Sequence, residues 1–190
     1  TIDQNGGVFR TGAGNYSVRV YPQTSSFTSG VLQFTDAYQS TQLGTITVNG
    51  GAVVSAANLL SGGTQGLLSG ASATLTTVSS GGVQAVGTSA LAISSILLAG
   101  TQTISSGGTA TITLISSGGI QNVSSGGTAN AMTISTGGTQ NVFSTALASG
   151  GTIGSGGTQI LSGGTASATV ISNAGTQNIS ANGIASGITI

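Results

Sequence analysis

The sequence predicts an all-β fold, a parallel β-helix (β-solenoid) with about 19 residues per rung. Seven glutamines recur at spacings of 19, 18, 19, 19, 19 and 18 residues, and each follows a glycine turn and one spacer residue. Aliphatic residues and alanines recur with the same period. Only 2% of the 190 residues are charged. A fixed period of about 20 residues is the signature of a solenoid.

Four columns of residues appear when the repeats are aligned on the glutamines. The glutamines are Gln65, Gln84, Gln102, Gln121, Gln140, Gln159 and Gln177. Two residues later lie the aliphatics Leu67, Val86, Ile104, Val123, Val142, Leu161 and Ile179. About eight residues after each glutamine lie Ala73, Ala92, Ala110, Ala129, Ala148, Ala166 and Ala185. A third column before the glycine turn holds Leu59, Val78, Leu97, Ile115, Ile134, Ile153, Ile171 and Ile190.

Each rung is expected to run strand, turn, strand, turn. Side chains alternate along a strand, so Gln140 and Val142 point to the same side. Segments such as SSGG at 124–127 break the strands, because glycine reaches positive φ without steric cost. Abundant glycine and β-branched residues argue against helix. We therefore expect rungs about 4.8 Å apart around a continuous aliphatic core.

Two parts of the chain are distinguished by composition. Residues 1–44 hold all four charges (Asp3, Arg10, Arg19 and Asp36), which predicts an irregular aromatic N-terminal cap or junction segment, or two atypical rungs. Residues 45–190 are predicted to form the regular β-solenoid array. Disorder is the usual alternative for a Gly- and Ser-rich sequence, but 37% hydrophobic residues at strict spacing argue against it.

The glutamine column has two interpretations. Stacked amides can hydrogen-bond from rung to rung as a structural ladder. A row of amides on a surface could instead bind sugar hydroxyls. The ladder is favoured because each glutamine shares its side of the strand with the aliphatic residue two positions later.

Composition excludes several function classes. The chain has no cysteine and no histidine, so the usual zinc and haem ligands and the usual Ser-His-Asp and Cys-His constellations are missing. Two arginines do not form a basic surface for nucleic acid. The best candidate for a membrane span, residues 90–100, is too short. We expect no enzyme, no cofactor, no metal and no membrane span.

The last residues predict an assembly end. The sequence stops at Ile190 after a full rung, which would leave Ile188 and Ile190 at an open end with unpaired backbone groups. Repeated head-to-tail contact generates a filament, and the lack of charge removes the usual defence against it. The expected function is a secreted structural protein that self-assembles head to tail into extracellular filaments for the cell surface or biofilm matrix. Its partners would be copies of itself, and cell-surface or matrix glycans in addition.

Ice or glycan binding by a flat face is a third possibility. Thr-x-Thr pairs occur at 74/76 and 111/113, although the rung between them has Ile93 and Ser95 at the matching positions. Calcium-binding nonapeptide rolls need repeated aspartates in their turns, which this array lacks.

The segments 115–134 (ISSGGIQNVSSGGTANAMTI) and 134–142 (ISTGGTQNV) resemble the 19-residue AIDA-type repeats of self-associating autotransporter adhesins. The resemblance spans about residues 48–190. It implies a right-handed β-helical passenger outside the outer membrane of a Gram-negative bacterium, acting in aggregation, adhesion and biofilm. A fragment of such a passenger is therefore the alternative function. The resemblance also implies O-linked heptose on turn serines, and the matching positions are Ser79, Ser80, Ser105, Ser106, Ser116, Ser117, Ser124 and Ser125.

Overall fold

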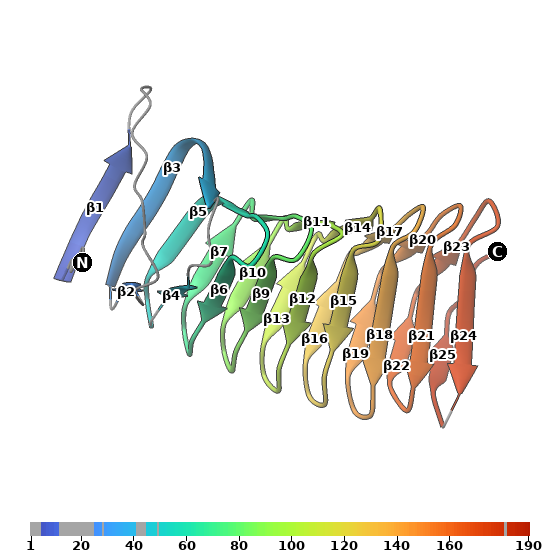
Figure 1. The fold of residues 1–190 in the computed structure, drawn as a ribbon. Coiled ribbons are helices and arrows are strands. Elements are labelled where there is room, and N and C mark those ends of the chain that lie inside the picture. The colour runs from blue at the N-terminus through green and yellow to red at the C-terminus, as the bar shows by residue number, and fades with distance from the viewer. Residues whose placement is uncertain (1–4, 12–24, 28, 41–44, 49, 181) are drawn as a thin grey trace.

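The computed structural model describes residues 5–11, 25–27, 29–40, 45–48, 50–180 and 182–190. It confirms the predicted β-solenoid, in which short strands stack in parallel along one axis (Figure 1). Equivalent residues of successive repeats lie side by side, so that Gln121 pairs with Gln140 and Val123 with Val142. No helix in the part of the chain described here is long and apolar enough to span a membrane.

The first face of the solenoid is a nine-stranded parallel sheet that carries the glutamines. Its strands follow chain order, each pairing with the next rung. They are β2 (Ser25–Phe27), β4 (Thr45–Val48), β6 (Thr64–Leu67), β9 (Val83–Val86), β12 (Thr101–Ile104), β15 (Ile120–Val123), β18 (Thr139–Phe143), β21 (Thr158–Ser162) and β24 (Thr176–Ser180).

The second and third faces share one 16-stranded sheet. They are joined because β5 (Val53–Leu59) pairs through its first half with β7 and through its second half with β8. The second face continues with β7 (Ser72–Thr74), β10 (Leu91–Ile93), β13 (Thr109–Thr111), β16 (Thr128–Asn130), β19 (Leu147–Ser149), β22 (Thr165–Ser167) and β25 (Ile184–Ser186). The third face holds β8 (Thr77–Val78), β11 (Ile96–Leu98), β14 (Leu114–Ser116), β17 (Thr133–Ile134), β20 (Thr152–Ile153) and β23 (Val170–Ile171).

A rung therefore has three strands and three corners, and the expectation of two strands and two turns was wrong. The missed corner is a single residue with positive φ between the second and third faces. It is occupied by Ala56, Leu75, Ser94, Ile112, Ala131, Gly150, Ala168 and Gly187. Its backbone amide donates to the next rung, as from Ile112 to the Asn130 carbonyl at 3.0 Å. This bond holds a left-handed conformation that most of these residues do not favour, so the sequence gives no glycine signal.

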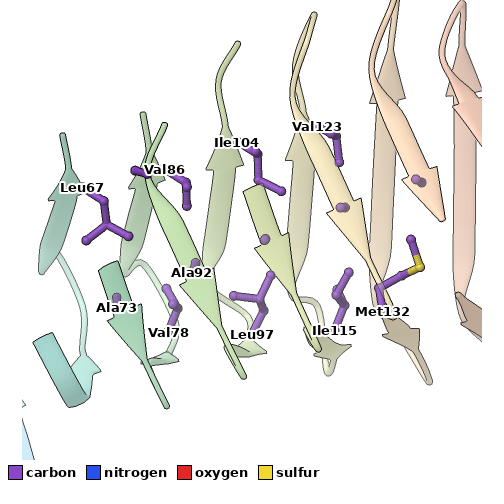
Figure 2. Packing of buried hydrophobic residues seen from close by; sticks show 14 of the residues in the cluster. Leu67, Ala73, Val78, Val86, Ala92, Leu97, Ile104, Ile115, Val123 and Met132 are labelled. Carbon is purple, nitrogen blue, oxygen red and sulfur yellow. The ribbon is translucent and has the colours of Figure 1, made fainter. Parts of the chain in front are cut away.

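The apolar core is lined by one column from each face. On the first face, Leu67 to Leu161 of the aliphatic column are at most 1% exposed, and the second face contributes the alanines. The third face contributes Leu59 to Ile153, which are equally buried. Figure 2 shows Leu67, Val86, Ile104 and Val123 opposite Val78, Leu97 and Ile115. One apolar cluster thus runs the length of the array.

The N-terminal strands join the same sheets. The strand β1 (Asn5–Thr11) pairs in parallel with β3 (Ser29–Ser40), and β3 pairs with β5. On the first face, β2 pairs with β4. Strand pairing is therefore continuous across the predicted boundary at residue 44. Residues 1–4, 12–24, 28 and 41–44 lie outside the described residues, so the irregular cap stays a prediction.

Candidate functional site

The seven glutamines form one hydrogen-bonded ladder inside the first face. Each Nε2 donates to the Oε1 of the glutamine one rung earlier, at 2.7 Å from Gln84 to Gln65 and at 2.6 Å at every later step. Gln65, Gln84, Gln102, Gln121, Gln140 and Gln159 are 0% exposed. Amides buried in this way are out of reach of a sugar hydroxyl.

The ladder has a direction and a defined beginning. In every pair the amide N–H that donates points toward the N-terminal end of the solenoid, and the carbonyl that accepts points toward the other end. Gln65 pairs in register with Ile46, which offers no acceptor, and its Nε2 is buried without a partner. A buried unpaired amide costs about 1–3 kcal/mol. The glutamine ladder contains this unpaired amide only at its first member, Gln65, whereas each further rung adds a paired amide.

A column of polar residues accompanies the glutamines from the third face, and sequence reasoning missed it. Ser95 Oγ donates to Gln84 Oε1 at 3.1 Å and accepts from Gln102 Nε2 at 3.2 Å. Thr76 Oγ1 donates to Gln65 Oε1 at 3.5 Å. Thr76, Ser95, Thr113 and Thr169 are at most 2% exposed. They follow the one-residue corner directly, which turns them inward.

The same column contains a matched pair of unlike residues. Met132 is buried, and the equivalent position in the next rung is occupied by Gly151. A Cβ added to Gly151 would overlap the Met132 sulfur and lie 3.2 Å from its Cε. The flexible Met132 side chain therefore fills the space that the missing side chain of Gly151 leaves.

The Thr-x-Thr pairs considered for ice binding do not form an exposed ladder. Thr76 and Thr113 are 0% and 2% exposed, because the corner residue between the two threonines turns the second one inward. Outward polar residues do stack on the first face, where Asn141 Nδ2 donates to Asn122 Oδ1 at 2.8 Å.

The predicted assembly residues lie on the last rung. Ile190 is 99% exposed, and Ile188 is half-buried. Ile179 and Ile184 on the same rung are 53% and 57% exposed. Their equivalents one rung earlier, Leu161 and Thr165, are buried and half-buried, because a following rung covers them.

The predicted sugar-acceptor serines lie at two of the three corners. Ser80, Ser105, Ser106, Ser117 and Ser125 are exposed, whereas Ser79, Ser116 and Ser124 are half-buried. Ser106 and Ser125 follow strands of the first face, and Ser80 and Ser117 follow strands of the third face. The exposed serines thus form two rows along the solenoid.

No metal-binding cluster is found in the part of the chain that the structure describes. In those ranges no three His, Cys, Asp or Glu residues lie together.

Comparison with solved structures finds a structural likeness. The chain is similar to the crystal structure of a TibC-catalysed, hyper-glycosylated fragment of TibA, residues 55–350, with 27% sequence identity and a TM-score of 0.60. The match covers 96% of this chain and 74% of that one. No family model and no curated protein matches the sequence. TibA is an autotransporter adhesin, and the likeness supports an adhesin-like solenoid.

Proposed function

We propose that this chain is the β-solenoid passenger, or part of it, of an adhesin on the surface of a Gram-negative bacterium, and that it holds cells to one another. The observation that carries the proposal is the likeness to the TibA fragment over 96% of the chain. An uncharged rod with long regular faces suits contact between surfaces, and chemistry would need groups that residues 37–190 lack.

Surface display tests this proposal. The chain is displayed by a carrier on a bacterium that does not aggregate, and settling of the culture is measured against cells with the carrier alone. We expect displaying cells to settle and to form clumps under the microscope. Mixing fluorescently labelled displaying cells with unlabelled carrier cells separates the partners. Clumps of displaying cells alone indicate contact between copies, and mixed clumps indicate binding to surface glycans or proteins. Cells that neither settle nor clump with either partner would remove the proposal.

Glycosylation of the exposed turn serines is part of this proposal. The TibA fragment is hyper-glycosylated by TibC, and the serines that match by position include the exposed Ser80, Ser106, Ser117 and Ser125. Co-expression with a heptosyltransferase, followed by mass spectrometry of peptides, tests it. We expect heptose on the exposed serines before the half-buried Ser79, Ser116 and Ser124. An unmodified chain would refute the glycosylation and leave the adhesin proposal itself intact.

Head-to-tail assembly is a second mode of contact, supported by the exposed isoleucines of the last rung. A first rung from another copy would cover Ile179 and Ile184 and continue the parallel sheets. The next rung of a longer chain would cover the same side chains. Electron microscopy of the purified 190-residue chain tests whether copies stack end to end in this way. We expect thin fibres that Ile188→Asp abolishes, since a charge would be buried in the junction. Dispersed rods from the unaltered chain would contradict this mode.

A further inference from the structure

One corner between the first and second faces departs from the repeat. The residue that follows the buried aliphatic of the first face is Ser105 and Ser124 in two earlier rungs, and Phe143 in the next. Phe143 is the only aromatic residue after Tyr38 in the sequence. Its side chain is 42% exposed. An exposed ring gains little from folding, so neither the repeat nor the core explains it.

The turn after Phe143 also lacks the glycine of the repeat. The Phe143 carbonyl accepts a hydrogen bond from the Ala146 amide at 2.9 Å, which closes the turn. Thr145 has a φ of 61° in this turn, where the previous rung has Gly126. Its hydroxyl lies 2.6 Å from the Ser125 hydroxyl of that rung. A β-branched residue is rare in left-handed conformation, and strained backbone that the fold does not require points to a function at that place.

Polar side chains surround Phe143 on the outer side of the first face. Side chains alternate along β18, so Asn141 and Phe143 both point outward. The strands β15, β18 and β21 lie side by side (Figure 1), which places Asn122 next to Asn141 and Ser162 next to Phe143. The bond from Asn141 Nδ2 to Asn122 Oδ1 uses one amide hydrogen and one lone pair, so both amides can still donate and accept. We name Phe143, Asn122, Asn141 and Ser162 the Phe143 platform.

The chemistry of the Phe143 platform fits a neutral sugar. One face of a pyranose ring carries C–H groups with a small positive charge, which pack against the negative face of an aromatic ring. The hydroxyls at the edge of the sugar both donate and accept, as side-chain amides do. A wholly apolar partner would leave the two asparagine amides unpaired. A charged partner would find no opposite charge, because residues 37–190 have none.

We propose that the Phe143 platform binds a neutral glycan of a cell surface, with one pyranose ring stacked on Phe143 and its hydroxyls bonded to Asn141 and Asn122. Successive outward positions of a strand are about 6.7 Å apart, and neighbouring rungs are about 4.8 Å apart. Both amides therefore lie within reach of a sugar placed over the ring. This inference rests on the proposed function, because it names the partner and the site by which displaying cells would adhere.

Isothermal titration calorimetry of the purified chain tests the site with three neutral polysaccharides, dextran, mannan and galactan, and with the anionic alginate. We expect binding to at least one neutral polysaccharide and none to alginate. Phe143→Ser installs the residue of the previous rung, so we expect a dissociation constant raised at least tenfold and a melting temperature close to that of the unaltered chain. Alginate bound as tightly as the neutral polysaccharides would overturn the proposal.

Leu68→Ser is the matched control for Phe143→Ser. Leu68 occupies the same column in the first regular rung and is 47% exposed. Its replacement removes a comparable apolar side chain, and we expect the dissociation constant to change less than twofold. Phe143→Tyr keeps the aromatic ring and should bind within threefold of the unaltered chain. Equal effects of Leu68→Ser and Phe143→Ser, or no effect of either, would overturn the proposal.

The amide contact has its own matched pair. Asn141→Ala should raise the dissociation constant at least fivefold. Asn178 lies in the same column two rungs later, and Asn178→Ala should change it less than twofold. Equal effects of these two variants would overturn the amide contact.

Failure of the site and failure of the proposed function give different results. A chain that binds none of the three neutral polysaccharides, while displaying cells still clump, overturns the Phe143 platform and leaves the adhesin proposal intact. A chain that binds none of them and does not clump cells defeats both.

Discussion

The inward and outward sides of the same strands follow different rules. Inward positions hold nearly the same residue in every rung: glutamine, then an aliphatic residue on the first face, alanine on the second, and an aliphatic residue on the third. Outward positions on the third face change from Thr77 to Ile96, Leu114 and Thr133 in successive rungs. The interior must repeat because each side chain packs on its own equivalent, whereas the exterior is free to vary. The fold is therefore encoded by the inward side chains, whereas the outward side chains differ from rung to rung.

The amide pairs give the sharpest test of this contrast. We expect Gln121→Leu to destabilise the chain by about 2–6 kcal/mol, because it leaves Gln102 Oε1 and Gln140 Nε2 buried without their 2.6 Å partners. The outward control is Asn122→Leu, which removes the 2.8 Å bond to Asn141 at a half-buried site. Its expected cost is below about 1 kcal/mol. Urea unfolding measures both, and equal losses would contradict the division.

The aliphatic columns give the next largest effect. Ile115→Ala opens a cavity at a side chain that is 0% exposed, so we expect a loss of about 2–5 kcal/mol. Leu114 is its outward neighbour and is 37% exposed. Leu114→Ala should cost below about 1 kcal/mol, since little burial is lost. Denaturation midpoints check this pair, and a larger loss for Leu114→Ala would show that the outer side also carries the fold.

Gly157 directly precedes a strand of the first face, and the fold is expected to need a glycine there because a side chain would clash. A Cβ at Gly157 would lie 2.5 Å from the Ile134 carbonyl oxygen of the previous rung. Gly157→Ala should therefore destabilise by about 1–3 kcal/mol. Gly66 has open space around its would-be Cβ, so Gly66→Ala should stabilise by about 0.5–1 kcal/mol. Thermal unfolding of the two alanine variants should shift in opposite directions, and a parallel shift would refute the steric account.

The sequence predicted the columns that repeat in every rung and missed the positions whose residue changes from rung to rung. The period placed the glutamine and aliphatic columns, because identical residues at a fixed spacing leave one way to stack. The third corner escaped because Leu75, Ser94 and Ile112 carry no turn signal, and a hydrogen bond that their backbone amide donates to the next rung holds their positive φ. Missing that corner also misplaced Thr76 and Thr113, which it turns inward. The exposed apolar residues Leu75 and Ile112 lie on those variable positions, where no periodicity could indicate them.

The pair of Met132 and Gly151 tests whether an irregular step inside the array is compensated locally. Gly151→Ala would place a Cβ against the Met132 sulfur, and we expect a loss of about 1–2 kcal/mol, because the flexible thioether can move partly aside. Met132→Ala alone should lose about 2 kcal/mol or more through its cavity. In the double variant the clash is gone, so its loss should fall below the sum by at least about 0.5 kcal/mol. Additive losses in a double-mutant cycle would mean that the two side-chain positions are independent, and that the interior tolerates a non-repeating rung without matched partners.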